Sequence, residues 1–393
     1  MLLFKETLQL LNKVVGPYVM EGFVSGHFVK QGSYKSFQPE KINQAWKVED
    51  MELLSLLSQA DRQLGRLDMY SEYVPNIDLF ITMHVLKEAT QSSKIEGTKT
   101  NIEEALLNRE DLAEEKRDDW EEVQHYIQAL NEAIEKLNEL PFSSRLIRET
   151  HKTLLSGVRG RHKIPGEFRS SQNWIGGSSI SDATFVPPVH TTIHEYMSDL
   201  ERFVHNEALF FPELLKIALI HYQFETIHPF LDGNGRVGRL MITLYLVEKN
   251  ILKKPILYLS DFFERNRQLY YDNLMIVRTK HDITRWYKFF LTGIIETAKN
   301  SIETFDKILK LQQEVENSIQ TLGSRARNAA LIIRYLYKHP ILDYQMAKSQ
   351  TGMSAPSVYR LLGDLESMGI LREITGGRRG KLFLFSDYID LFR

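Results

Sequence analysis

The sequence predicts a mainly α-helical protein that ends in a small helical domain with a β-hairpin. Over most of residues 48–249, apolar residues recur at spacings of three and four, which is the period of amphipathic helices. Residues 165–188 break this pattern with two short strand-like runs around a polar turn, so a short hairpin is expected there. Residues 325–393 read as three short helices and a hairpin-like tail, which is the pattern of winged helix-turn-helix domains.

Composition bounds the class of protein. A chain of 393 residues favours two or three domains, and 43% hydrophobic with 25% charged residues is typical of a globular protein. The absence of cysteine excludes disulfides and thiolate metal sites or nucleophiles. No run of about twenty apolar residues is present, and residues 1–15 lack the apolar core of a signal peptide. We therefore expect a cytoplasmic protein without membrane association.

The first half of the chain is expected to form five helices after an irregular start. Glycines and a proline punctuate residues 1–50, which predicts few long elements there. Helices are expected over residues 48–67, 77–95 and 143–155, with two more within 100–140, where Thr100 offers an N-cap. Residues 1–110 are interpreted as an N-terminal helical region.

The second half is expected to hold the reactive core and the tail. Helices are predicted over residues 193–206, 212–226 and 235–249, followed by a long connecting helix over 294–322. We place a catalytic domain at 111–300, the connecting helix at 301–324 and the winged-helix domain at 325–393. Residues 321–385 hold 10 Lys and Arg against 4 Asp and Glu, a net of +6, with Arg378, Arg379 and Lys381 at the turn of the tail hairpin. That charge favours contact with DNA phosphates, although such domains also bind proteins.

The stretch HPFLDGNGRVGR, residues 228–239, combines the groups that transfer from a nucleoside triphosphate requires. They are the base His228, the carboxylate Asp232, the loop residues Gly233, Asn234 and Gly235, and the arginines Arg236 and Arg239. The glycines let backbone N–H groups face an anion, and arginines near a helix N-terminus favour phosphate. Asp232 suits Mg²⁺, and an imidazole with its ordinary near-neutral pKa suits a general base.

The same string resembles the signature of the Fic (filamentation induced by cAMP) family, HPFx[D/E]GNGRxxR, and matches every specified position. The resemblance implies a compact helical domain that transfers AMP from ATP to a protein hydroxyl. It implies that His228 deprotonates a target Ser, Thr or Tyr and that Asp232 holds Mg²⁺. Gly233, Asn234 and Gly235 would then cradle phosphate oxygens while Arg236 and Arg239 neutralise the β/γ end. Residues 178–186 would be the core of a flap that pairs with an extended target segment.

A second string, Ser92-Ser93-Lys94-Ile95-Glu96-Gly97, fits the inhibitory pattern of the family, [S/T]xxxE[G/N], through Ser92, Glu96 and Gly97. It precedes the signature, as in the class whose inhibitory helix is N-terminal to the core. Glu96 is expected to pair with Arg239 in a bidentate carboxylate–guanidinium contact and so to occupy the arginine meant for the γ-phosphate. Without the signature this pattern would describe many helix ends.

Several alternatives stay open at this point. The protein could remove AMP instead, with the same glutamate positioning water, or it could be a transcription regulator that senses a nucleotide without transfer. The expected partners are a target protein with a hydroxyl side chain, the protein itself as a substrate, a second copy of the chain, and DNA. Tyr270, Tyr271 and Asn273 are either adenine contacts or core and capping residues. His221 is interpreted as a packing residue.

Overall fold

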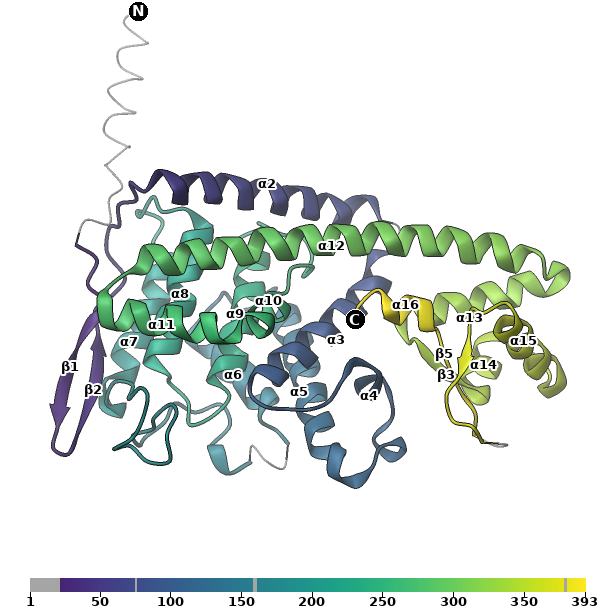
Figure 1. Cartoon of the computed structure of the whole chain (residues 1–393), viewed down its shortest axis with the longest axis horizontal. Coiled ribbons are helices and arrows are strands. Elements are labelled where there is room, and N and C mark those ends of the chain that lie inside the picture. The colour runs from purple at the N-terminus through teal and green to yellow at the C-terminus, as the bar shows by residue number, and fades with distance from the viewer. Residues whose placement is uncertain (1–21, 75, 158–160, 378–379) are drawn as a thin grey trace, which may run out of the picture.

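The computed structural model describes residues 22–74, 76–157, 161–377 and 380–393, and in these ranges the protein is mainly helical (Figure 1). The helices are α2 (Met51–Tyr73), α3 (Ile77–Ile95), α4 (Ile102–Leu106), α5 (Glu114–Lys136), α6 (Ser144–Leu154), α7 (Ile193–His205), α8 (Glu213–Ile227), α9 (Asn234–Glu248), α10 (Ser260–Arg265), α11 (Arg267–Lys280), α12 (Ile283–Gln320), α13 (Ala326–Lys338), α14 (Tyr344–Thr351), α15 (Ala355–Ser367) and α16 (Ser386–Asp390). The strands are β1 (Gly26–Gln31), β2 (Tyr34–Pro39), β3 (Ile341–Asp343), β4 (Arg372–Glu373) and β5 (Leu382–Leu384). None of the helices in the described ranges is both long and apolar enough to cross a membrane.

Helices α8 and α9 form the centre of the molecule. Every residue of α8 from Leu214 to Ile227 is buried, as expected of a helix that other helices surround on all sides. Helix α9 packs against it, and α2 and α12 run side by side along one face (Figure 1). The loop between α8 and α9 is therefore held between two buried helices.

Several helix bounds differ from those predicted. Helix α3 has the predicted bounds, but the long helix α12 begins at Ile283, well before residue 294. The N-cap of α4 is Asn101 and not Thr100, because the Asn101 side chain accepts from the Glu104 N–H and the Glu104 carboxylate accepts from the Asn101 N–H. Helices α10 and α11 were not predicted.

The hairpin predicted within residues 165–188 is reduced to a single antiparallel bridge, and a regular hairpin lies at residues 26–39. Strands β1 and β2 pair in register through a two-residue loop in which Gly32 has a φ of 59°, as hairpin turns require. In the described part of 165–188, pairing is limited to one bridge between Ile175 and Phe185. The Asp182 carboxylate accepts the backbone N–H groups of Ser178 and Ser179, so these amides close a compact turn and do not form a ladder.

The β1–β2 hairpin lies beside the segment where the hairpin was expected. The Phe37 N–H of β2 donates to the Val186 carbonyl oxygen at 2.8 Å, and the Phe37 and Phe185 rings are 5.8 Å apart. The β1–β2 hairpin therefore packs against the segment predicted as a flap. We had expected this part of the chain, within residues 1–50, to be irregular.

The tail has the predicted three helices, α13 to α15, and the predicted two strands, β4 and β5. A third strand, β3, pairs with β5 and gives the order β3-β5-β4. Arg378 and Arg379 lie outside the described residues. The winged-helix assignment, the domain boundaries and DNA contact stay predictions.

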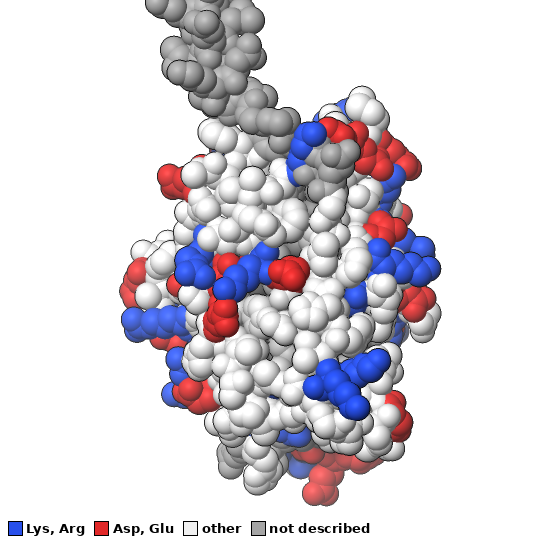
Figure 2. Space-filling model, turned by 90° about the vertical axis from the view of Figure 1, so that its left-hand side faces the viewer, with Lys and Arg blue, Asp and Glu red and all other residues white. Residues whose placement is uncertain are grey.

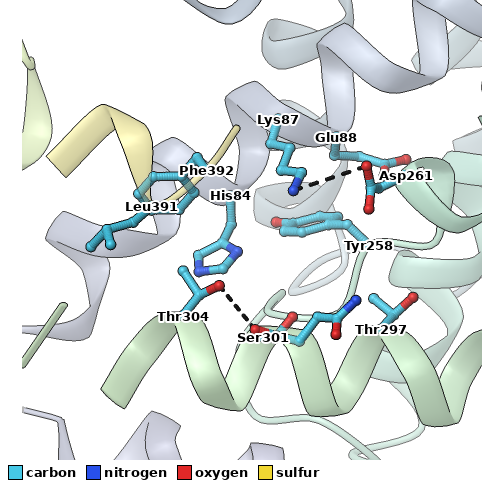
Figure 3. Close-up of a pocket in the computed structure, with 11 residues that line it drawn as sticks. His84, Lys87, Glu88, Tyr258, Asp261, Thr297, Ser301, Thr304, Leu391 and Phe392 are labelled. Atoms are coloured by element: carbon cyan, nitrogen blue, oxygen red, sulfur yellow. Dashed lines mark hydrogen bonds and ion pairs between the residues drawn. The ribbon is translucent and has the colours of Figure 1, made fainter. Parts of the chain in front are cut away.

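The tail packs on helix α3. The Phe80 ring lies 5.3 Å from that of Tyr337 and 6.4 Å from that of Tyr388, and the His84 ring lies 5.0 Å from that of Phe392. A small polar cavity of about 50 Å³ lies between α3, α12 and the last residues of the chain, with His84 and Phe392 on its wall (Figure 3). The tail thus packs against α3, the helix that ends just before Glu96.

Candidate active site

The loop between α8 and α9 is fixed by its own side chains. Asn234 is 1% exposed, and its amide accepts from the Phe230 N–H at 2.8 Å and donates to the Phe230 carbonyl oxygen at 2.9 Å. The Phe230 ring is buried and stacks on His151 with ring centroids 3.7 Å apart. The Asn234 side chain therefore shapes the loop, and only its backbone N–H remains a candidate contact for phosphate.

His228 occupies the end of α8 in a left-handed conformation, with φ 49° and ψ 60°. Gly233, with φ 74°, then caps α9. These two turns bring the imidazole and the N-terminal N–H groups of α9 to one place, which combines a base with an anion site.

The near-neutral pKa assumed for His228 is wrong for this structure. Burial, followed by the charges of Arg278 and Arg169, lowers the pKa of His228 to about 3. The imidazole is therefore neutral at physiological pH, which is the form that accepts a proton. A bound polyanion would offset the two arginines and raise this pKa.

Arg239 is held by the end of α3. Its Nε donates to the Ser92 hydroxyl at 2.9 Å, and its Nη2 donates to the Ser92 carbonyl oxygen at 2.9 Å and to Glu96 Oε1 at 2.7 Å. Burial raises the pKa of Glu96, but the Arg239 charge and hydrogen bond outweigh it and the pKa is lowered. Gly97 follows with a φ of 106°, which lets the chain turn directly after the glutamate. The predicted pair is present, but through one hydrogen bond and not the bidentate contact expected, because the other donors of Arg239 that bond here go to Ser92.

Glu96 also covers the start of α9. A Cβ atom built on Gly235 would stand 2.2 Å from Glu96 Oε1, so glycine is needed for this approach. The carboxylate thus lies where the N-terminus of α9 offers its N–H groups to an anion.

Arg236 has a partner that the sequence analysis missed. Its Nη1 lies 3.2 Å from Glu122 Oε2 on α5, and its Nη2 lies 3.7 Å from Asp232 Oδ1. Both signature arginines are therefore paired with carboxylates, Arg236 from α5 and Arg239 from the end of α3. The acidic run in α5 gave no sign of which glutamate would reach the loop.

Asp232 is suited to share a metal ion with a ligand. Its side chain is 46% exposed, and its Oδ1 accepts the Gly233 N–H. Within the described ranges, no three His, Asp or Glu side chains gather closely enough to hold a metal ion by themselves. The residues present therefore fit Mg²⁺ only if phosphate oxygens complete its coordination, as is usual for this ion.

A cavity of about 280 Å³ opens beside the loop. Its lining combines charged and apolar side chains, namely Glu96, Ile175, Thr184, Phe185, Glu225, His228, Gly235, Arg239, Tyr270, Tyr271, Leu274, Met275 and Arg278. A cavity with both charged and apolar walls suits the phosphates and the base of a nucleotide.

Of the three residues considered as possible adenine contacts, two line the cavity and one does not. Tyr270 and Tyr271 line the cavity, whereas Asn273 is buried and bonds to the Leu269 carbonyl oxygen and to Arg285. His221 is a packing residue, as predicted: its ring nitrogens lie 2.9 Å from the Gly238 carbonyl oxygen and 2.8 Å from the Tyr270 hydroxyl.

Arg278 is a further residue that sequence reasoning missed. Its Nη2 donates to the Glu225 carbonyl oxygen at 3.0 Å, and its guanidinium lies 3.8 Å from the centre of the Phe185 ring. It ties the last turn of α8 to the segment predicted as a flap. Since α11 itself was not predicted, its arginine could not be placed.

Comparison with known proteins gives two family matches. Residues 54–135 match the family model described as Fic/DOC family N-terminal, and residues 141–246 match the one described as Fic/DOC family. A probable protein adenylyltransferase of Aquifex aeolicus is 27% identical over 173 residues, which cover 43% of this chain and 50% of that protein. Protein adenylyltransferase Fic of Aedes aegypti is 31% identical over 144 residues, covering 36% of this chain and 26% of that protein. The chain thus spans half or less of the length of these relatives.

Solved structures give the same fold. A Fic family protein from Desulfovibrio desulfuricans superposes with a TM-score of 0.55 at 19% identity, over 87% of this chain and 98% of that one. A signaling protein with a Fic domain from Bacteroides thetaiotaomicron gives a TM-score of 0.51 at 19% identity, over 63% and 96%.

Proposed function

This chain belongs to the Fic/DOC family, and on that premise we propose that it is a protein adenylyltransferase that transfers AMP from ATP to a hydroxyl side chain of a target protein. The observation that carries the proposal is the convergence on one cavity of His228, the N-terminus of α9 and Arg239. A base, a set of N–H groups and a guanidinium are what positioning and charge neutralisation in such a transfer require.

In the proposed reaction, His228 takes the proton of a target Ser, Thr or Tyr hydroxyl. The hydroxyl oxygen attacks the α-phosphorus of ATP, a new P–O bond forms, and the bond to the β-phosphate oxygen breaks to release pyrophosphate. Gly233, Asn234 and Gly235 contact phosphate oxygens through backbone N–H groups, and Arg236 and Arg239 bind the β/γ end. Mg²⁺ at Asp232 would supply further charge neutralisation on the phosphates.

We further propose that Glu96 inhibits this transfer. The carboxylate is bonded to Arg239 and lies against Gly235 at the start of α9, so it occupies the arginine and the space meant for the γ-phosphate. ATP can bind in line only after Glu96 moves away. Ser92 assists, because its hydroxyl and carbonyl oxygens hold the same guanidinium.

The position of Glu96 also favours one second candidate, removal of AMP from a modified protein. A carboxylate in the same cavity as His228 could orient a water molecule toward the phosphorus. The two reactions differ in what Glu96 contributes, because transfer gains when Glu96 is removed whereas AMP removal requires it.

The target segment is proposed to bind beside β2 and residues 178–186. The end of the molecule that carries the β1–β2 hairpin is mostly uncharged, with basic and acidic side chains in small separate clusters (Figure 2). Such a surface favours backbone pairing with an extended segment over recognition by charge. The protein itself is a candidate target, and a second copy of the chain and DNA remain proposed partners.

The test is intact-mass analysis of the protein, alone and with a cell extract, after incubation with Mg²⁺ and each nucleoside triphosphate. Gain of one AMP from ATP is the expected result. Absence of any nucleotide adduct on any protein, with ATP bound, would favour the nucleotide-sensing alternative.

A matched pair of histidine variants assigns the base. His228→Ala should lower the labelling rate by about 10²–10⁴ because it removes the general base. His194→Ala, which changes an exposed histidine, should label like the parent. Labelling of His228→Ala at the parental rate would remove His228 from this role.

A further inference from the structure

Glu225 is a buried carboxyl with an unused oxygen. It lies one helical turn before His228 on α8, is 6% exposed, and lines the cavity of about 280 Å³. Among the described residues, none provides a hydrogen-bond partner for its Oε1. A buried polar atom without a partner costs stability, so this oxygen marks a place where a polar group of a ligand would bind favourably.

The carboxyl neighbours both the charged and the apolar groups of the cavity. Its Oε1 stands 2.2 Å from where a Cβ of Gly238 would be, so it rests on α9 one turn beyond Gly235. It interacts with the charges of Arg239 and Glu96, which line the same cavity. It also interacts with Arg278, which donates to the Glu225 carbonyl oxygen and covers the Phe185 ring.

Glu225 can carry a proton near neutral pH. Burial raises its pKa to about 7, with Arg239 and Arg278 lowering it and Glu96 raising it. The charged and titratable groups around it are Glu96 at the end of α3, His228 at the end of α8, Arg239 on α9, and Tyr270, Tyr271 and Arg278 on α11. A triphosphate would favour the protonated form further. A protonated carboxyl both donates and accepts hydrogen bonds and does not repel phosphate.

We propose that Glu225 is a nucleotide-specificity residue that hydrogen-bonds to a ribose hydroxyl of the bound nucleoside triphosphate. The proposal rests on the proposed function, since it takes ATP as the ligand. In a nucleotide the ribose joins the phosphates to the base, and Glu225 neighbours both Arg239, which suits phosphate, and Arg278 on the Phe185 ring, which belongs to the apolar lining.

The experiment measures ATP, 2′-dATP and 3′-dATP binding to the full chain with Mg²⁺ by titration calorimetry. The parent should bind ATP about threefold to tenfold more tightly than at least one deoxy analogue, as expected for one hydrogen bond. Glu225→Ala should bind all three equally. Glu225→Gln, whose amide also donates and accepts, should keep the discrimination.

A second readout remains informative if the alanine variant does not fold. Above pH 7 the parent carboxyl ionises, so ATP affinity should fall between pH 7 and 9 in the parent and stay level in Glu225→Gln. A parent that binds ATP but does not discriminate, or an alanine variant that discriminates like the parent, overturns the ribose contact alone. A parent that binds no nucleoside triphosphate under any of these conditions overturns the proposed function and the ribose contact with it.

Discussion

Glu96 and Glu225 line the same cavity, and their pKa values are shifted in opposite directions. Each places its Oε1 2.2 Å from a would-be Cβ on α9, Glu96 at Gly235 and Glu225 at Gly238. Burial raises the pKa of both, but the charge and hydrogen bond of Arg239 reverse the shift for Glu96, whereas the pKa of Glu225 stays raised, at about 7. The contact with the Arg239 guanidinium therefore keeps Glu96 an anion at neutral pH, where Glu225 is about half protonated.

Of the variants at the two glutamates, removal of the Glu96 carboxylate should change the transfer rate most. Glu96→Gly should raise the rate of AMP incorporation about tenfold to a hundredfold, because a charge-assisted pair is worth roughly 1.5–3 kcal/mol and its loss frees Arg239. Incorporation is measured by intact mass over time. Glu110→Gly, which removes an exposed glutamate, serves as the matched control and should leave the rate at the parental value.

Adding Arg239→Ala to Glu96→Gly should abolish that gain, since the freed arginine is what produces it. A folded Glu96→Gly protein that transfers nothing, but whose parent releases AMP from a modified target, would assign the removal reaction instead.

The pH dependence of stability separates the two glutamates next. For Glu225 the folded pKa, about 7, exceeds the ordinary value of 4.5 for a glutamate, so its contribution to stability is fully present below pH 4.5 and is lost as the pH rises through 7. Glu225→Gln should remove this loss and be more stable than the parent at pH 8 by on the order of 3 kcal/mol, with the difference shrinking toward pH 4. Urea unfolding at a series of pH values measures it.

Glu96 should behave with the opposite sign. The pKa of Glu96 is lowered in the folded protein. Its contribution to stability is therefore present above pH 4.5 and is lost as the pH falls through the folded pKa. Parallel stability curves for the parent and Glu225→Gln from pH 4 to 9 would contradict the assignment of Glu225.

The smallest effect tests the contact between Glu225 and α9. Gly238→Ala should lower stability by about 1–2 kcal/mol, because the methyl group meets Glu225 Oε1. Gly363→Ala, in α15, meets nothing within 4 Å and should instead raise stability by about 0.4–1 kcal/mol through its effect on the unfolded chain. Thermal unfolding of the two variants should therefore shift in opposite directions, and shifts of the same sign would rule out the close contact at Gly238.

The signature and the inhibitory glutamate were predictable because local sequence carries them. The twelve residues from His228 form one loop and one helix start, and α3 has the bounds that its apolar spacing predicts. The pairing of Glu96 with Arg239 across 143 residues followed from the family resemblance and not from spacing.

The rest of the site depends on tertiary packing. The use of Glu122 for Arg236, the approach of Arg278 to Phe185 and the low pKa of His228 all arise from side chains brought together by folding. The short pairing in the predicted hairpin of residues 165–188 has a local cause, because the Asp182 carboxylate accepts the Ser178 and Ser179 N–H groups that a longer ladder would use. Glu225 drew no attention in the sequence, since a single glutamate in an apolar helix does not reveal what it faces.

Because of the contact between Glu96 and Arg239, the fraction of inhibited molecules does not depend on the concentration of the protein. The inhibiting anion is attached to the polypeptide that it inhibits, so dilution of the protein does not weaken the contact. With a pair worth roughly 1.5–3 kcal/mol, about one to ten molecules in a hundred would have the arginine free at any moment. Synthesis of more protein would leave that fraction unchanged, whereas ATP, a target or a partner that displaces α3 would raise it.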